Sequence, residues 1–254
     1  MPAGGIIALT GATGFVGHAL LEKLLSEGYN VRALVRKNTL TSHANLQIVH
    51  GDLSSRQALK DLCGGASVVL HCAGLTKSLS KDTMLEINAY ATQRLFREAE
   101  AAGVKRLLYI SSLAARAPEV SVYAKSKYQG ELGAGDVKDI GWDIFRPPAV
   151  YGPGDTQMLV FFQMIQKRLA ILAGAPEARV SLIHVEDLVG AIYAWLSSKT
   201  STQNIYELSG ADDNGYSWKE IFEIAAKALE TRPFYISPPV RVLRMIAWLS
   251  LALG

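Results

Sequence analysis

Short apolar runs alternate with longer amphipathic stretches along the first 150 residues of the chain. The apolar runs predict buried strands at residues 6–10, 30–36, 46–50, 67–72, 105–110 and 140–146. The longer stretches have helical spacing of their apolar residues and predict helices at 15–27, 54–62, 83–102 and 122–134. This alternation is typical of βαβ units, so we expect an α/β fold with a doubly wound, mostly parallel sheet.

The pattern is less regular after residue 150. It predicts a helix at 156–169, strands at 180–184 and 204–208, a helix at 186–196 and a further helix that begins at Ser217. Ser217 and Glu220 have the spacing of a capping box, which marks a helix start. No linker separates the two regions. We therefore expect a nucleotide-binding domain at 1–150 and a smaller, interleaved substrate lobe at 151–254.

The composition narrows the class of protein. Of the 254 residues, 49% are hydrophobic and 19% are charged, which excludes an intrinsically disordered chain. The net charge of +3 is small, and no basic run interleaved with aromatic residues points to nucleic acid. The two cysteines, Cys63 and Cys72, are too few for a disulfide framework and lack metal-ligand spacing. We expect a cytoplasmic protein that binds no metal.

The end of the chain carries a second apolar feature. Residues 240–253 are apolar apart from Arg241, Arg244 and Ser250, and this stretch is too short to span a bilayer. It predicts either a helix that packs on the body of the protein or an interfacial helix in peripheral contact with a membrane. In the second case the two arginines would lie near lipid head groups and Trp248 at the boundary.

A glycine-rich turn follows the first predicted strand. Gly11, Gly14 and Gly17 lie between the apolar run at 6–10 and the helix predicted at 15–27. In such a strand–turn–helix unit, the first glycine allows a tight turn, the second a close backbone approach to phosphate, and the third close helix packing. The free N–H groups at the helix start then face an anion. The turn therefore predicts a seat for a pyrophosphate.

A tyrosine and a lysine share one face of the helix predicted at 122–134. Tyr123 and Lys127 are spaced i, i+4, and a nearby ammonium lowers the pKa of a phenol from its usual value of about 10. Ser111 and Ser112 end the strand predicted at 105–110, at the edge where such sheets bind ligands. A serine hydroxyl there can hold a substrate carbonyl while the tyrosine transfers a proton.

These motifs, together with others along the chain, resemble one family. The further matching segments are Gly51-Asp52-Leu53, His71-Cys72-Ala73-Gly74, Asn88, Arg146-Pro147-Pro148-Ala149-Val150-Tyr151-Gly152 and His184-Val185-Glu186-Asp187-Leu188. The chain resembles the extended branch of the short-chain dehydrogenase/reductase superfamily, the NAD(P)-dependent epimerase/dehydratase group. The resemblance implies a Rossmann-type fold. Members of this branch are usually longer, so we expect the chain to be C-terminally truncated.

The resemblance also implies roles for individual residues. Ser112, Tyr123 and Lys127 are the expected catalytic residues, and Lys127 is also expected to bind the nicotinamide ribose. Asn88 is expected to hold the long helix against a strand end. The residues expected to bind the cofactor are Gly11, Thr13, Gly14, Phe15, Val16, Gly17, Arg36, Asp52, Leu53, Cys72, Ala73, Gly74, Tyr123, Lys127, Pro147 and Val150.

The end of the second predicted strand bears on the choice of cofactor. An acidic residue at this position binds the adenosine ribose of NAD, yet no carboxylate lies near Val35. Arg36 follows instead, and a guanidinium suits a 2′-phosphate through paired hydrogen bonds. We expect NADP(H) as the cofactor, with NAD(H) as the alternative. Arg32 is a second candidate for the phosphate contact.

Three functions remain open. The leading one is an NADP(H)-dependent oxidoreductase that interconverts a ketone and a secondary alcohol on a small or lipid-like substrate. Only ten residues separate Ser112 from Tyr123, whereas many sugar-nucleotide enzymes of the group have a longer insertion there. A nucleotide-sugar epimerase with tightly bound NAD is the alternative, and a non-catalytic dinucleotide sensor or assembly subunit is the third.

Two further expectations concern substrate and partners. The apolar residues taken to favour a lipid-like substrate are Leu75, Leu79, Met158, Phe161 and Phe162. The resemblance also makes a homodimer possible, formed through the helices predicted at 83–102 and 122–134.

Overall fold

The computed structural model describes residues 5–37, 40–172, 178–198, 200–210, 212 and 214–238. The apolar stretch at 240–253, with its expected packing or membrane contact, lies outside the described residues. The chain forms two compact units. The first consists of Met1–Pro148 with Val185–Leu208, and the second of Ala149–His184 with Ser209–Gly254.

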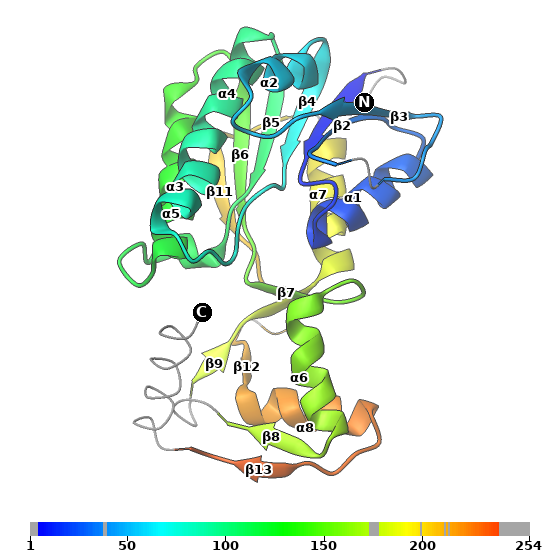
Figure 1. Ribbon diagram of the computed structural model, residues 1–254, viewed down its shortest axis with the longest axis vertical. Coiled ribbons are helices and arrows are strands. Elements are labelled where there is room, and N and C mark those ends of the chain that lie inside the picture. The colour runs from blue at the N-terminus through cyan, green and yellow to red at the C-terminus, as the bar shows by residue number, and fades with distance from the viewer. Residues whose placement is uncertain are drawn as a thin grey trace. The chain divides into compact units, whose positions relative to one another are not determined.

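A seven-stranded parallel sheet forms the centre of the first unit (Figure 1). Its strand order is β11-β6-β5-β4-β1-β2-β3, and every neighbouring pair is parallel. The strands are β1 (Ile6–Thr10), β2 (Asn30–Val35), β3 (Leu46–His50), β4 (Ala66–His71), β5 (Arg106–Ile110), β6 (Gly141–Arg146) and β11 (Asn204–Glu207). The order reverses direction beside β1, so the predicted doubly wound fold is confirmed.

Helices cover both faces of this sheet (Figure 1). One face carries α1 (Phe15–Ser26) and α7 (Val185–Ser197), which contact each other; the other carries α2 (Arg56–Cys63), α4 (Ala91–Ala101) and α5 (Val122–Leu132). The helix predicted at 83–102 is divided into α3 (Lys81–Leu85), a π-helical turn η1 (Glu86–Tyr90) and α4. Two short 3₁₀ helices, η2 (Leu113–Arg116) and η3 (Gly133–Asp136), flank α5.

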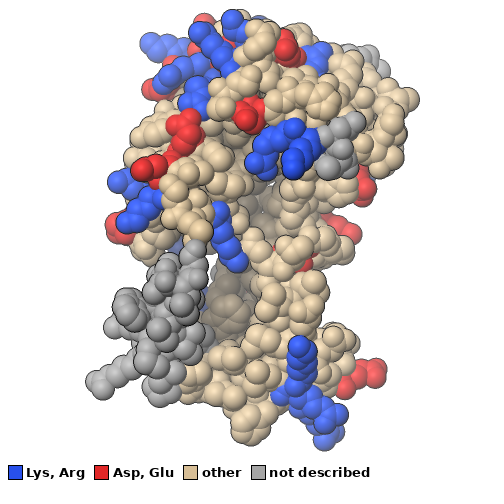
Figure 2. Space-filling view, in the orientation of Figure 1, with Lys and Arg blue, Asp and Glu red and all other residues tan. Residues whose placement is uncertain are grey.

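The apolar faces of these helices form the core against the sheet. All five residues of β5 are buried, and Leu59, Leu95 and Phe96 from α2 and α4 are fully buried beside them. Burial of each such side chain contributes about 1.5–3 kcal/mol. Acidic and basic side chains are interspersed on the outer surface (Figure 2), where Arg94 pairs with Glu86 at 2.7 Å.

The segment from α7 to β11 belongs to the first unit, although it lies beyond residue 150. Arg106 of β5 donates to the carbonyl oxygens of Trp195 at 2.9 Å and Thr200 at 2.6 Å. The Trp195 indole donates to Asp143 of β6 at 2.7 Å. These bonds join 185–208 to the sheet. The assignment of residues 1–150 to cofactor binding and of residues 151–254 to substrate binding stays a prediction.

Within its described residues, the second unit contains three small two-stranded sheets. They pair β7 (Ala149–Tyr151) with β10 (Leu182–His184), β9 (Arg179–Val180) with β12 (Tyr216–Ser217), and β8 (Leu169–Ile171) with β13 (Phe234–Ile236). Its helices are α6 (Thr156–Gln166) and α8 (Trp218–Ala228), and the predicted capping box of Ser217 and Glu220 is present. The strand predicted at 180–184 is divided between β9 and β10.

The small core of the second unit accounts for two residues that the sequence placed near a substrate. Phe161 and Phe162 pack against a cluster that contains Ile165 and Phe222, and the Phe161 and Phe222 ring centroids are 4.6 Å apart. Their apolar character is thus explained by packing and carries no argument about the substrate. Among the described helices of both units, none is long and apolar enough to cross a membrane.

Candidate functional site

The glycine turn between β1 and α1 depends on the absence of side chains. Gly11 has φ +78°, and a Cβ at this position would lie 2.6 Å from the backbone nitrogen of Ala73. A Cβ at Gly17 would lie 2.1 Å from the carbonyl oxygen of Gly11. Only glycine therefore allows α1 to begin directly against the turn and the turn to lie directly against the end of β4.

The start of α1 is suited to an anion. Gly14 is the N-cap, and no side chain caps the helix or places a negative charge in its first turn. Thr13 and Gly14 are exposed, and Phe15 and Val16 are half-buried. The first N–H groups of a helix lack intrahelical partners and carry a partial positive charge. This cradle of backbone fits the pyrophosphate of a dinucleotide.

The loop after β4 brings the glycine turn close to α5. The Ala73 N–H donates to the Thr10 hydroxyl at 3.3 Å, and Cys72 is half-buried beside it. Burial raises the pKa of the Cys72 thiol to about 12, so the side chain is neutral. A Cβ at Gly74 would lie 3.5 Å from Lys127 Nζ. The predicted residues 72–74 thus lie between the pyrophosphate seat and the lysine.

Lys127 is held inside the first unit by the end of β5. Its Nζ donates to the carbonyl oxygen of Ile110 at 2.8 Å and lies 4.4 Å from the centre of the Tyr109 ring. The side chain is buried, and desolvation lowers its pKa to about 7. The carboxylate of Glu131, one turn further along α5, opposes this shift.

Tyr123 lies one turn before Lys127 on the same helix. Burial raises the pKa of the Tyr123 phenol, and a hydrogen bond with Ser112 reduces that shift. The direction is opposite to the one expected from the i, i+4 spacing, because desolvation outweighs charge effects here and Lys127 donates to Ile110 instead. The phenol is therefore protonated at neutral pH.

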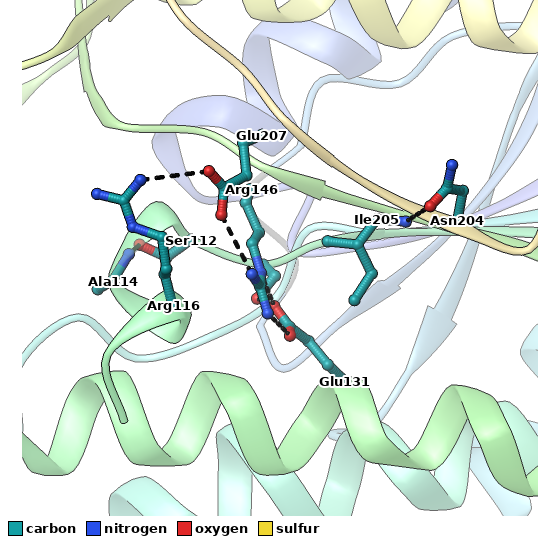
Figure 3. Close-up of polar contacts among 9 residues, drawn as sticks. Ser112, Ala114, Arg116, Glu131, Arg146, Asn204, Ile205 and Glu207 are labelled. Carbon is teal, nitrogen blue, oxygen red and sulfur yellow. Dashed lines mark hydrogen bonds and ion pairs between the residues drawn. The ribbon is translucent and has the colours of Figure 1, made fainter. Parts of the chain in front are cut away.

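Ser112 is positioned by two neighbouring strands. The N–H of Ser111 donates to Phe145 O, and that of Leu113 donates to Pro147 O, both at 2.8 Å. The Ser112 hydroxyl accepts from the N–H of Ala114 at 3.2 Å and so caps η2 (Figure 3). Pro147 is buried next to this strand end. The predicted Ser112, Tyr123 and Pro147 are thereby brought to one edge of the sheet.

Asn88 joins the loop after β4 to α5. Its amide accepts from the N–H of Leu75 at 2.7 Å and donates to the carbonyl of Leu75 at 2.8 Å. It also donates to Ser126, whose hydroxyl donates to Tyr123 O. Asn88 lies in the π-helical turn η1, a feature that often marks functional sites. The expected anchoring role is confirmed, but the helical periodicity of the sequence did not indicate the π-turn.

The ends of β2 and β3 carry the residues expected near the adenosine. Arg36 is exposed directly after β2, and its charge acts on Asp52. Hydrogen bonds from Ser54 are the main reason that the pKa of Asp52 is lowered. Leu53 is buried in the core. The contacts of Asp52 and Leu53 fix the turn that leads into α2.

Arg32, the second candidate for a phosphate contact, has another role. Its guanidinium donates to the carbonyl oxygens of Asp61, Leu62 and Gly64, at 3.1, 3.2 and 2.6 Å. These are carbonyl groups at the end of α2, which lack intrahelical partners. Arg32 therefore caps α2, and Arg36 is the arginine whose guanidinium is exposed at the strand end.

Val150 belongs to β7 in the second unit, where it pairs with Ile183. No three His, Cys, Asp or Glu side chains among the described residues are grouped so that they could hold a metal ion.

Comparison with known proteins gives a consistent picture. Residues 7–209 match the NAD dependent epimerase/dehydratase family. Ceramide reductase from Caulobacter vibrioides is 38% identical over 242 residues, which cover 93% of this chain and 74% of that protein. UDP-glucose 4-epimerase from Vibrio cholerae is 27% identical over 262 residues, which cover 92% of this chain and 79% of that protein. The chain spans between 64% and 74% of the lengths of the ceramide reductase and three further relatives.

A solved structure has the same arrangement of elements. MoeE5 in complex with UDP-glucuronic acid and NAD has a TM-score of 0.77 and 25% sequence identity. The match covers 92% of this chain and 85% of MoeE5.

Proposed function

Because the chain belongs to the NAD-dependent epimerase/dehydratase family, whose members are NAD(P)-dependent short-chain dehydrogenase/reductase enzymes, we propose that it is an NADP(H)-dependent ketone reductase. It would interconvert a ketone and a secondary alcohol on a lipid of the ceramide type. The observation that carries the proposal is the Ser112–Tyr123–Lys127 group at the end of β5, in a chain similar to ceramide reductase.

The residues of the chain fit proton transfer to a carbonyl. The bound nicotinamide nucleotide supplies the hydride in reduction and accepts it in oxidation. The raised pKa keeps Tyr123 protonated at neutral pH, which suits a phenol that donates its proton to a carbonyl oxygen. Ser112, whose hydrogen bond with Tyr123 offsets part of the rise in the phenol's pKa, would orient the phenol towards the carbonyl. In the oxidative direction Tyr123 would first have to lose its own proton, and its phenolate would then accept the proton of the alcohol.

The nucleotide would be held by the glycine turn and the adjacent loops. Gly11 and Gly17 leave space that a Cβ would fill, and the uncapped start of α1 faces a phosphate. Lys127 would exchange its bond to Ile110 for the nicotinamide ribose. Arg36 would bind a 2′-phosphate, since its side chain is exposed and Arg32 is engaged by α2.

We expect Arg36→Ala to change cofactor preference. Loss of charge-assisted hydrogen bonds to a 2′-phosphate should raise the Kd for NADPH by about 10- to 100-fold. The Kd for NADH should stay within about twofold, since NADH lacks that phosphate. Nucleotide fluorescence titrations of the wild type and the variant measure both constants. Lys37→Ala, at the adjacent exposed lysine, is the matched control.

Two results would contradict the choice of NADPH. One is a wild-type protein that binds NADH more tightly than NADPH. The other is an equal loss of affinity for both nucleotides in Arg36→Ala, since the arginine would then contribute only general positive charge.

The substrate class is supported by the similarity to ceramide reductase. Leu79, which is 89% exposed in the loop after β4, also offers apolar surface, and loops that follow the strands of such sheets are where ligands bind. NADPH oxidation should be measured with a ketone of the ceramide type, a short-chain ketone and UDP-glucose. Turnover of the lipid ketone above the short-chain ketone is the expected result. Turnover of neither ketone would overturn the proposal.

A nucleotide-sugar epimerase is the second candidate. The similarities to UDP-glucose 4-epimerase and to MoeE5 favour it. An epimerase returns the hydride to the same substrate, so it retains its nucleotide and consumes none. Release of one equivalent of NAD upon denaturation of the purified protein, with epimerisation of UDP-glucose, would support this function over the reductase.

A further inference from the structure

A buried ion pair lies beside the proton-transfer group of the first unit. The Glu131 carboxylate accepts from Arg146 Nε at 3.0 Å and from Arg146 Nη2 at 2.6 Å, a bidentate arrangement (Figure 3). The side chains of Glu131 and Arg146 are only 3% and 13% exposed. Bidentate pairs of this kind are strong and geometrically specific. Glu131 therefore has a fixed orientation.

Glu131 also binds the strand end that carries Ser112. Its Oε1 accepts a hydrogen bond from the Ser111 hydroxyl, which is buried as well. Ser111 is the residue before Ser112, and Glu131 lies on α5 with Tyr123. The carboxylate thus joins the end of β5 to the helix that carries the phenol.

The ion pair continues towards the surface. Arg146 Nη1 contacts Glu207 at 3.2 Å, and Arg116 contacts the other oxygen of Glu207 at 3.4 Å (Figure 3). Glu207 is opposite Arg146 in the pairing of β11 with β6. These outer contacts hold the Arg146 guanidinium in place, so that it faces Glu131.

Glu131 acts on Lys127 through charge. The two residues are spaced i, i+4 on α5, and the carboxylate raises the pKa of Lys127 against the larger effect of burial. The other titratable groups that face Lys127 are Cys72 and His71 from the end of β4 and Tyr109 from β5. His71 and Tyr109 are kept neutral by burial. Glu131 is therefore the anionic side chain among these groups.

We propose that Glu131 is a positioning residue for proton transfer: its carboxylate, held by Arg146, fixes the Ser111–Ser112 end of β5 against α5, one helical turn after Lys127. The inference rests on the proposed function and extends it. Glu131 does not contact the reacting atoms. It acts through Ser111 and Lys127.

The test is Glu131→Gln, which keeps the shape of the side chain and removes its charge. We expect kcat for ketone reduction to fall by about 10- to 100-fold, because the reacting groups would be misplaced. The KM for NADPH should stay within about threefold of the wild-type value. NMR titration of lysine-labelled protein, with Lys127 assigned by Lys127→Arg, should place the Lys127 transition at least about one pH unit below that of the wild type.

The matched control is Glu98→Gln. Glu98 is another buried carboxylate, paired with Arg56 on the α2–α4 side of the first unit. This change should leave kcat within about twofold of the wild-type value and the Lys127 transition within about 0.2 pH units of that in the wild type. The reason is that Glu98 is not among the charges that act on Lys127.

Loss of one partner from a buried pair can prevent folding, so a second variant is needed. Glu131→Gln with Arg146→Met removes both charges of the Glu131–Arg146 pair, so neither is left without its partner, and this variant should fold. It should show the same fall in kcat and the same shift of Lys127. An unshifted Lys127 titration in this double variant would overturn the inference, even if kcat fell, because Glu131 would then be only a structural contact.

The NMR titration needs no turnover, which separates this inference from the proposed function. A wild-type protein that reduces no ketone, but in which Glu131→Gln shifts the Lys127 titration, would overturn the proposed reductase and leave the positioning role intact. If the wild type is a reductase but neither kcat nor the Lys127 titration responds to Glu131→Gln, the positioning role is overturned and the proposed reductase stands.

Discussion

Burial affects Tyr123 and Lys127 of α5 in the same sense, towards the neutral form. It raises the pKa of the Tyr123 phenol and lowers that of the Lys127 ammonium to about 7. A neutral phenol is the form that can donate a proton to a carbonyl oxygen. At the residue scale, desolvation therefore leaves Tyr123 in the form that the proposed reduction requires, and the hydrogen bond with Ser112 offsets part of the rise in its pKa.

Tyr123→Phe should remove proton transfer and leave the fold intact. The change deletes one hydroxyl, so the expected fall in kcat is about 10²- to 10⁴-fold, with little change in the Kd for NADPH. Steady-state kinetics and nucleotide fluorescence measure the two quantities. Tyr128→Phe, on the exposed side of the same helix, is the control and should keep normal turnover. Near-normal turnover in Tyr123→Phe would rule out the mechanism.

At the element scale, the start of α1 depends on close contact between a helix and a turn. Gly17 is buried in the first turn of α1, facing the carbonyl of Gly11. The glycine turn itself packs against the loop after β4. A displacement of α1 would therefore move the pyrophosphate seat and the residues around Ala73 together.

Gly17→Ala should weaken both folding and nucleotide binding. The new Cβ would lie 2.1 Å from Gly11 O, so α1 must shift, at about 1–3 kcal/mol of stability. Gly190→Ala is the matched control, because a Cβ in the middle of α7 would meet no atom within 4 Å. That change should stabilise the protein by up to about 1 kcal/mol. Chemical denaturation and NADPH titration provide the comparison; equal stability of both variants would contradict the packing argument.

At the scale of the whole molecule, a buried polar network lies at the centre of the first unit. His71 is fully buried at the end of β4 and bonds Thr10 at 2.6 Å and Thr92 at 2.9 Å. Its ring stacks on Tyr109, with centroids 5.0 Å apart. These contacts join β1, β4, β5 and α4. Burial, with a smaller contribution from the charge of Lys127, lowers the pKa of His71 to about 3.

The stability of the protein should therefore fall in acid. The unfolded chain binds a proton at His71 below pH 6.5, whereas the folded chain does so only near pH 3. Between these values His71 contributes a loss of about 1.4 kcal/mol per pH unit as the pH falls. Lys127 acts in a separate window, between its folded pKa of about 7 and its usual 10.5, where stability rises with pH.

Denaturation at pH 6.5, 5.5 and 4.5 measures this dependence. His71→Gln should reduce the slope by about 1.4 kcal/mol per pH unit, whereas His50→Gln, at an exposed histidine of β3, should not change it. An unchanged slope in His71→Gln would show that other groups cause the acid sensitivity.

Most of the first unit could be predicted from local patterns. The strands predicted at 6–10 and 46–50 coincide with β1 and β3, and the other strand and helix boundaries of this unit differ by at most two residues, although the helix predicted at 83–102 is divided into three elements. Local periodicity specifies such elements because their buried faces are repeated along the chain. The π-turn at 86–90 was not predicted because it lies inside a longer helical pattern. In the second unit, β9 and β10 were predicted as one strand at 180–184, whereas β7, β8, β12 and β13 were not predicted, because strands of two or three residues have too few positions to show a period.

The sequence by itself determined the glycine turn, the doubly wound parallel class of the sheet, and the helix that carries Tyr123 and Lys127. Each of these follows from local patterns along the chain. Tertiary structure decided the rest. It assigned Arg32 to the end of α2, Phe161 to a core, and Glu131 to the side of Ser111 and Arg146. It also set the direction of the Tyr123 pKa shift. These outcomes depend on burial and on partners distant in sequence, and no local pattern records either.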